Sequence, residues 1–183
     1  MLTETSNLFL IGYRGSGKSA VGRIAAERLG ATFFDTDVEI ERRAGKTVSE
    51  IFASDGETAF RTLEATVIDD LSRGQNCVLA LGGGAVLRPG NRAKLKVRGR
   101  TAWLTAGPET LWQRIERHEA EGHRRPNLTA VGGLAEVVEL LARRLPVYRE
   151  SADWVVDTEG RTPAEVAGAI LDHFRPAGAG SKP

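Results

Sequence analysis

A short run near the N-terminus has the residue types and spacing needed to bind phosphate. Residues 12–19 read GYRGSGKS and match the pattern G-x-x-x-x-G-K-[ST]. The glycines allow backbone N–H groups to turn inward around phosphate oxygens. Lys18 can reach the β- and γ-phosphates of a nucleotide, and the Ser19 hydroxyl can ligate Mg²⁺. We call residues 12–19 the phosphate loop and predict that they bind a nucleotide.

The residues on either side of the phosphate loop provide the context that the motif requires. An apolar run at residues 8–11 precedes the loop, and residues 20–29 follow it with a helical pattern. In a strand–loop–helix unit, the positive N-terminal end of the helix dipole points at the bound phosphates. The alternative is a glycine-rich turn that matches by chance, and the two flanks favour the phosphate site.

Two acids, Asp35 and Asp37, stand at the end of the next apolar run. Ligands of open α/β sheets lie at the carboxyl ends of strands, so we expect this pair beside the phosphate loop. Residues two apart on a strand point the same way, so both acids can line one cleft. One acid would help to hold hydrated Mg²⁺, and the other would face an acceptor hydroxyl and take its proton. The alternative is a helix cap, with Thr36 or Asp37 starting a helix through Ile40.

Three successive glycines, Gly82, Gly83 and Gly84, follow the third apolar run. Such a run indicates a backbone that comes very close to another group. A plain tight turn is the alternative, but a turn seldom needs three glycines, which favours the approach of a small ligand. The strand-end Asp of related nucleotide-hydrolysing proteins is absent here, which leaves Mg²⁺ to Ser19 and the acids at 35 and 37.

Three arginines outside the phosphate loop have to be judged one by one, because most basic residues of this chain are arginine. By residue type alone, Arg61 and Arg144 are more often solvated surface residues than ligand contacts. Arg125 lies in a polar, glycine-bounded segment at about residues 120–133, which we predict to be a mobile surface lid. A lid arginine can enter the site on closure and neutralise charge on a transferring phosphoryl group.

The elements that must position these residues alternate along the chain. Strands are predicted at residues 8–13, 32–35, 77–81, 101–105 and 154–157, as mostly continuous apolar runs. Helices are predicted at residues 20–29, 58–72, 109–119, 134–145 and 162–174. Alternating strands and helices favour a three-layer α/β domain with a parallel sheet and right-handed crossovers.

Composition limits the classes of protein that this chain can be. It has 183 residues, 41% of them hydrophobic and 27% charged, which is typical of a soluble globular domain. A net charge of +1 gives no support for binding nucleic acid or membrane. The single cysteine, Cys77, excludes an intramolecular disulfide and a cysteine-based metal site. No signal peptide or membrane span is evident, so we expect a cytoplasmic protein, with one domain at residues 1–175 and a flexible tail at 176–183.

Taken together, the order and spacing of these motifs resemble the shikimate kinase family. The resemblance covers about Asn7 to Phe174 and rests on the phosphate loop, Asp35-Thr36-Asp37, Phe60-Arg61 followed by Glu64, Leu81 to Val86, Arg125-Pro126, Arg144 with Tyr148-Arg149, and Val156-Asp157-Thr158. It implies a P-loop kinase fold related to nucleoside monophosphate kinases, with a five-stranded parallel sheet in the order 2-3-1-4-5 and a mobile lid. It also implies transfer of the ATP γ-phosphate to the 3-hydroxyl of shikimate, a step in aromatic amino-acid biosynthesis.

The resemblance assigns roles to individual positions. The residues implied to contact shikimate are Asp37, Arg61, Gly83 and Arg144. Arg61 and Arg144 would grip its carboxylate, because a planar guanidinium suits that group, while Asp37 and Gly83 would hold its hydroxyls. The residues implied to bind ATP are Gly15, Ser16, Gly17, Lys18, Ser19, the lid arginine Arg125, and Arg161 beside the adenine. Ser19 would ligate Mg²⁺, with Asp35 supporting the ion through water, and the catalytic groups would be Asp37, Lys18 and Arg125.

The lid departs from the family pattern in two ways. The family lid usually reads Arg-Pro-Leu-Leu, whereas this chain has Asn127 after Arg125 and Pro126. The stretch around Arg117 aligns loosely, so no adenine-stacking arginine is assigned there.

Three other functions remain open at this point: a gluconate kinase, a nucleoside monophosphate kinase, and a nucleotide-binding regulatory domain without phosphotransfer. The expected partners are ATP and shikimate, with no nucleic acid or membrane, and we expect a monomer.

Overall fold

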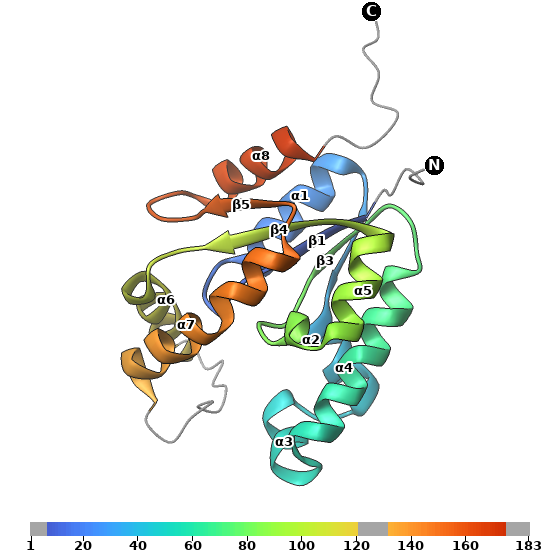
Figure 1. Cartoon of the computed structure of the whole chain (residues 1–183), viewed down its shortest axis with the longest axis vertical. Helices are drawn as coiled ribbons and strands as arrows, with labels where there is room; N and C mark the ends of the chain where they lie inside the picture. The colour runs from blue at the N-terminus through green and yellow to red at the C-terminus, as the bar shows by residue number, and fades with distance from the viewer. Residues whose placement is uncertain (1–6, 121–131, 175–183) are drawn as a thin grey trace, which may run out of the picture.

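The fold is a five-stranded parallel sheet between two layers of helices (Figure 1). The computed structural model describes residues 7–120 and 132–174. Its strands are β1 (Asn7–Ile11), β2 (Thr32–Asp35), β3 (Cys77–Ala80), β4 (Gly99–Thr105) and β5 (Trp154–Asp157). The order β2-β3-β1-β4-β5 and the parallel pairing of all neighbours confirm the predicted sheet. Parallel pairing brings all carboxyl ends of the strands to one edge.

The five predicted helices are present, and the structure adds others. The helices are α1 (Lys18–Leu29), α2 (Thr36–Ala44), α3 (Val48–Ser54), α4 (Gly56–Ser72), α5 (Pro89–Arg98), α6 (Pro108–Ala120), α7 (Gly133–Ser151) and α8 (Pro163–His173), with a 3₁₀ turn, η1, at Ala85–Leu87. Helix α3 and turn η1 are too short to show a helical period, and α5 buries only Leu95 among its apolar side chains. These three elements were therefore not predicted.

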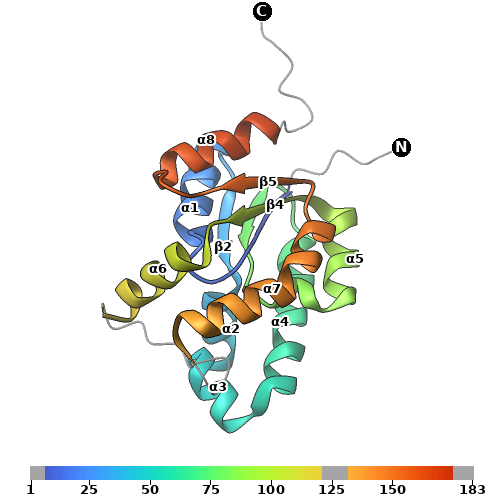
Figure 2. The ribbon, with the colours of Figure 1, turned by 60° about the vertical axis from the view of Figure 1, so that its left-hand side comes forward.

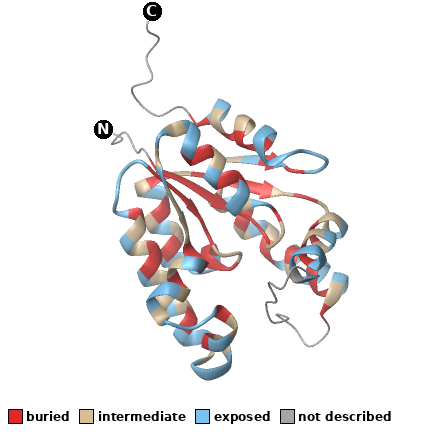
Figure 3. Cartoon of the chain, turned by 180° about the vertical axis from the view of Figure 1, so that it is seen from behind, coloured by how far each residue is buried: buried red, intermediate tan, exposed pale blue. Residues whose placement is uncertain are grey.

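Alternate residues of the inner strands supply two separate cores. In β1, Leu8 and Leu10 pack with α1 and α8, whereas Phe9 and Ile11 pack with α4, α5, α6 and α7. Figure 2 shows α1 and α8 on one side of the sheet and α4, α5 and α7 on the other. The inner strands β1, β3 and β4 are accordingly buried on both faces, as Figure 3 shows, whereas the edge strands β2 and β5 are only partly buried. This burial explains why the strands are continuous apolar runs in the sequence.

A third, smaller core joins α2, α3 and α4 beyond the β2 edge of the sheet. It is formed by Ile40, Val48, Ile51, Phe60 and Val67. Helix α3 begins with a capping box, in which the Thr47 side chain and the Glu50 side chain each bond to the other residue's backbone N–H. This core supports α4, which carries Arg61 into the site described below.

Helix α7 is longer than its pattern predicted. The predicted helix ended at Leu145, the last of its apolar positions, but the helix continues through Pro146 to Ser151. An interior proline usually ends or kinks a helix. Here the residues beyond it are anchored by Tyr148, which is fully buried and donates a hydrogen bond to the Gly83 carbonyl oxygen.

Some predicted segments fall outside the described part of the chain. These are the tail at residues 176–183 and residues 121–131 of the predicted lid, including Arg125. Among the described residues, no helix combines the length and apolar character needed to cross a bilayer.

Candidate active site

The phosphate loop leaves β1 in a conformation that only glycine adopts easily. Gly12, Gly15 and Gly17 have φ angles of 143°, 81° and 89°. A β-carbon on Gly12 would lie 2.3 Å from the Leu104 carbonyl oxygen, and one on Gly15 would lie 2.8 Å from the Leu111 carbonyl oxygen. The glycines thus let the loop pack closely on β4 and α6, and β1 ends at Ile11 rather than at Tyr13 as predicted.

The start of α1 presents donors to the inside of the phosphate loop. Helix α1 begins at Lys18, and Gly17 at its N-cap supplies no side-chain hydrogen bond. The first backbone N–H groups of the helix have no intrahelical acceptor, which suits an anion. The Lys18 Nζ lies over the loop and donates to the carbonyl oxygens of Gly12 and Tyr13, at 2.9 and 2.8 Å. This arrangement places the predicted phosphate-binding groups together.

Asp35 divides its two carboxylate oxygens between two tasks. One oxygen, Oδ1, accepts hydrogen bonds from the backbone N–H groups of Asp37 and Val38, at 3.0 and 3.5 Å, and so caps α2. The other, Oδ2, accepts a hydrogen bond from the Ser19 hydroxyl. The capping alternative is confirmed, since Thr36 starts a helix that runs through Ile40 to Ala44, with Asp35 as its N-cap. Capping and a second function coexist because they use different oxygens.

The pair of Ser19 and Asp35 has the donor chemistry of a magnesium site. A hydroxyl and a carboxylate oxygen are ligands that Mg²⁺ accepts, and this ion usually keeps several waters and substrate phosphates. Within the described residues, no group of three or more His, Cys, Asp or Glu side chains forms a metal cage. A small donor set beside a phosphate loop fits Mg²⁺ that arrives with a nucleotide.

The glycines after β3 admit side chains of the protein itself. A β-carbon on Gly82 would lie 2.8 Å from Asp37 Oδ1 and 3.0 Å from Glu64 Oε1. One on Gly84 would lie 2.6 Å from the Arg61 guanidinium. Gly82 also takes part in a turn, since its carbonyl oxygen accepts the N–H of Ala85. Other groups therefore do approach the backbone of these glycines closely, and they include Asp37 and Arg61, two of the side chains predicted to bind the acceptor.

Arg61 is held in place by an acid that the sequence did not assign a role. Its guanidinium donates to Glu64 Oε2 at 2.9 Å, and more weakly to Glu57 at 3.4 Å. Arg61 is about one quarter exposed, so it is neither a free surface residue nor fully buried. Glu64 follows Arg61 by three residues on α4, and that spacing places two side chains on the same helix face. This i,i+3 spacing was the available sequence signal for Glu64.

Burial makes Glu64 an unusual carboxyl group. Its side chain is 1% exposed, and Oε1 has no hydrogen-bond partner among the described residues. Burial raises the pKa of Glu64 to about 6, against the opposing effect of Arg61 and with a further rise from Asp37. Two carboxyl groups, Asp37 of α2 and Glu64 of α4, thus lie beside Gly82, and Arg61 compensates the charge of Glu64.

Helix α7 reaches the same glycines from the other side. The Tyr148 hydroxyl donates to the Gly83 carbonyl oxygen at 2.6 Å, and Arg144 approaches that oxygen at 3.4 Å. Burial raises the pKa of Tyr148 to about 12, so its hydroxyl keeps its proton. The Arg144 guanidinium stacks over the Tyr13 ring at 5.3 Å and is 9% exposed. Residue type alone suggested a surface position for Arg144, and this interpretation was wrong.

Gly83 joins the two halves of the site. A β-carbon on Gly83 would lie 3.5 Å from the Gly12 carbonyl oxygen and 3.6 Å from Arg144 Nη1. The phosphate loop and the cluster of Asp37, Arg61 and Arg144 are therefore contiguous rather than separate.

A further arginine ties the phosphate loop to the turn after β5. Arg114 on α6 donates to the Gly15 carbonyl oxygen at 3.4 Å and to both oxygens of Thr158 at 2.9 Å. Arg161 lies exposed in that turn region and donates to the Asp157 carbonyl oxygen at 3.2 Å. Sequence reasoning did not select Arg114, because nothing distinguishes it from the other arginines of the chain. Arg125 lies outside the described residues.

A family model described as shikimate kinase matches residues 14–175. The chain belongs to the shikimate kinase family. A shikimate kinase from Symbiobacterium thermophilum is 44% identical over 173 residues, which cover 94% of this chain and 98% of that protein. The shikimate kinase of Acinetobacter baumannii, solved in complex with shikimate, has a TM-score of 0.86 and 38% identity, and the match covers 92% of both chains.

A gluconokinase from Sinorhizobium meliloti is a more distant structural neighbour. Its TM-score is 0.55 at 18% identity, with 91% of this chain and 90% of that chain covered. This likeness shows a shared fold and nothing about the acceptor.

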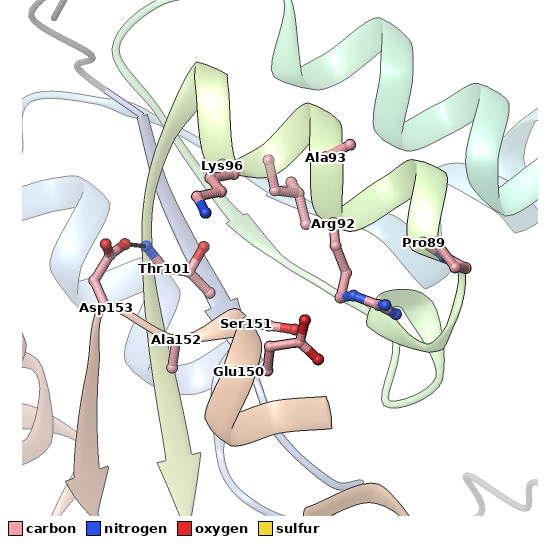
Figure 4. A pocket seen from close by; sticks show the side chains of 10 residues that line it. Pro89, Arg92, Ala93, Lys96, Thr101, Glu150, Ser151, Ala152 and Asp153 are labelled. Carbon is pink, nitrogen blue, oxygen red and sulfur yellow. Dashed lines mark hydrogen bonds between the residues drawn. The ribbon is translucent and has the colours of Figure 1, made fainter. Parts of the chain in front are cut away.

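A cavity of about 460 Å³ lies away from the site (Figure 4). It is lined by residues of α5, the first half of β4 and the end of α7, including Arg92, Lys96 and Glu150. Asp153 closes one side, where its carboxylate accepts the Thr101 N–H at 2.6 Å. These residues precede the carboxyl ends of β4 and β5, so the cavity is not part of the strand-end site.

Proposed function

We propose that this enzyme transfers the γ-phosphate of MgATP to the 3-hydroxyl of shikimate, giving shikimate 3-phosphate and ADP. The observation that carries the proposal is the contact at Gly83, where the phosphate loop adjoins the cluster of Asp37, Arg61 and Arg144. A donor phosphate and an acidic polyhydroxy acceptor can therefore meet in one crevice. The relatives that act on shikimate support the choice of acceptor.

On the nucleotide side, backbone N–H groups of Gly15 to Ser19 would surround the phosphates, with the Lys18 ammonium on the β- and γ-oxygens. To reach them, Lys18 would exchange its present contacts with the loop carbonyls. Ser19 would ligate Mg²⁺ directly and Asp35 would support the ion through water. When bound, Mg²⁺ offsets charge on the phosphate oxygens.

On the acceptor side, Arg61 and Arg144 would hold the carboxylate of shikimate, because both present guanidinium groups at the glycines after β3. Asp37 and Gly83 would hold its hydroxyls. The 3-hydroxyl oxygen attacks the γ-phosphorus, its proton passes to the Asp37 carboxylate, and the bond to the β,γ-bridging oxygen breaks to release ADP. The contribution of the protein is positioning and charge neutralisation rather than a covalent intermediate.

The remaining roles rest on the family resemblance alone. We propose that Arg125 enters the site as a lid arginine and that Arg161 borders the adenine, where it is exposed beyond β5. We also propose that residues 1–175 form one domain and that the enzyme acts as a monomer.

A panel of acceptors tests the function. ADP release would be measured with MgATP and shikimate, gluconate, AMP or CMP, with an acceptor-free reaction as the control for ATP hydrolysis. Shikimate is expected to give by far the highest kcat/KM. Preference for gluconate or a nucleotide would replace the proposed acceptor, and ATP binding without ADP release from any acceptor would favour a regulatory domain.

A further inference from the structure

The phosphate loop has a buried ionic contact that the phosphate-binding motif does not require. Arg14 occupies one of the variable positions of the motif, and its Nη2 lies 2.8 Å from Oε1 of Glu136 in the first turn of α7. The Glu136 side chain is fully buried and that of Arg14 is 12% exposed. Arg14 Nε has no hydrogen-bond partner within the described residues. The guanidinium is therefore directed at α7 rather than satisfied by the loop around it.

The same helix carries acceptor-binding chemistry eight residues further on. Arg144 stacks over the ring of Tyr13, the neighbour of Arg14, and approaches the Gly83 carbonyl oxygen. Helix α7 contacts α6, η1 and β4, and Figure 1 shows it beside α6. It thus contacts two consecutive residues of the phosphate loop through two charged side chains, Glu136 and Arg144.

We propose that Arg14 and Glu136 are positioning residues for phosphoryl transfer, which fix the phosphate loop against the helix that carries Arg144. The proposal rests on the proposed function. The pair sets where the terminal phosphate lies relative to the acceptor, and neither residue needs to touch a substrate. A buried pair suits this task, because either charge left alone would be costly and the contact therefore persists.

The location of the pair defines which kinetic quantity it controls. Each substrate has its own contacts, the loop backbone for the nucleotide and the arginines for the acceptor. Relative placement of the two substrates matters only when both are bound, so the pair acts on kcat and on the coupling between the two ligands. Misplacement by about 1 Å can lower a rate by about a hundredfold. Coupling between two sites is reciprocal and typically changes affinity by about five- to 150-fold.

The test replaces both members of the pair by apolar side chains of similar size, in Arg14→Met/Glu136→Leu. Replacing a whole buried ion pair in this way often leaves stability unchanged, whereas removing one partner does not. Two quantities are measured: kcat and KM for both substrates, and the ratio of acceptor Kd without and with saturating MgADP. We expect kcat to fall about tenfold or more. We expect a wild-type ratio of about five or more, falling to about one in the double variant.

Two further variants separate positioning from packing. Arg14→Lys keeps a cation that can reach Glu136, so we expect this variant to retain most of the wild-type kcat and Kd ratio. Thermal melting checks that each variant folds. The matched control is Arg143→Met/Glu139→Leu, an i,i+4 pair on the same helix whose side chains are 70% and 46% exposed. This control is expected to match the wild type, because its charges face solvent.

Three results would overturn the proposal. The Arg14→Met/Glu136→Leu variant could keep the kcat and the Kd ratio of the wild type, or the wild-type enzyme itself could have a Kd ratio of one. The variant could also have a raised KM for ATP with an unchanged kcat. The last would make Arg14 a direct nucleotide contact. The measurements use whichever acceptor the panel identifies. A result that excludes shikimate as the substrate is therefore distinct from a result that excludes the positioning role of Arg14 and Glu136.

Discussion

The two halves of the site are built in different ways. The nucleotide half is one continuous segment, residues 12–19, whose backbone amides and first helical turn would do most of the binding. The acceptor half is assembled from side chains of α2, α4 and α7 around the glycines after β3. A backbone site needs glycines and a helix start, which local sequence specifies. A side-chain site needs several elements to be placed correctly at once.

This difference predicts how each half responds to substitution. Single changes at Asp37 or Arg61 should leave nucleotide binding intact, because the loop would hold phosphate mainly through its own backbone N–H groups.

Asp37→Asn should have the largest effect on turnover. The amide keeps the size of the side chain beside Gly82 but cannot accept the hydroxyl proton. General-base catalysis contributes typically about 10²–10⁴-fold, so kcat should fall by about that factor. Steady-state kinetics and ATP binding by calorimetry measure the two halves separately. An unchanged kcat would remove Asp37 from its catalytic role, and a parallel loss of ATP affinity would break the contrast between the halves.

Arg61→Ala should weaken acceptor binding and spare the nucleotide. Loss of one partner of a charged pair costs about 2–5 kcal/mol, and here the acceptor carboxylate would lose its cation. Calorimetric titration with shikimate and with ATP tests both affinities. Arg73→Ala is the matched control, since Arg73 follows α4 and pairs with Asp69 at the surface. Equal acceptor affinity in the two variants would exclude Arg61 from the site.

Asp35→Asn should affect the metal without disturbing the fold. Asparagine caps a helix about as well as aspartate, so α2 keeps its N-cap. Loss of an outer-sphere carboxylate typically costs about 10–100-fold in metal affinity or activity. Activity measured against Mg²⁺ concentration should therefore show a higher requirement, while the melting temperature stays unchanged. A lower melting temperature with an unaltered Mg²⁺ requirement would show that Asp35 caps α2 and does not support the metal.

Glu64→Gln should change how stability depends on pH. The pKa of Glu64 is about 6 in the folded protein against an ordinary 4.5, so ionisation of this group opposes folding. Its contribution is fully present below about pH 4.5 and is lost as the pH rises through about 6. A shift of this size corresponds to about 2 kcal/mol. Urea unfolding from pH 4.5 to 7.5 should show that loss in the wild type, relative to the variant.

The control for this experiment is Glu57→Gln, on the same helix and beside the same arginine. Glu57 is 69% exposed, so its charge is already solvated, and its removal should leave the pH dependence of the wild type in place. If Glu64→Gln and Glu57→Gln show the same pH profile, burial does not control the ionisation of Glu64.

Much of the fold was predictable because the signals were local. Strands β2 and β5 were predicted with their observed bounds, although both are edge strands and only partly buried, because each is a short apolar run that ends at an Asp. The sheet order came from the family resemblance and not from periodicity. Helix α7 was predicted only to Leu145, where its apolar pattern ends, because the contact of Tyr148 with Gly83 that holds the rest of the helix is not local.

Within the site, the phosphate loop could be predicted from residue types and spacing, because that spacing encodes backbone geometry directly. The sequence also marked Asp35 and Asp37 as strand-end acids. The fold was needed to show that Arg144 is buried against Tyr13 and that Arg14 pairs with Glu136 across the chain, whereas the i,i+3 spacing of Arg61 and Glu64 already places their side chains on one helix face. The physical reason is that the ionic state and burial of a side chain depend on neighbours supplied by distant elements. Local spacing carries no information about those neighbours until the sheet has brought them together.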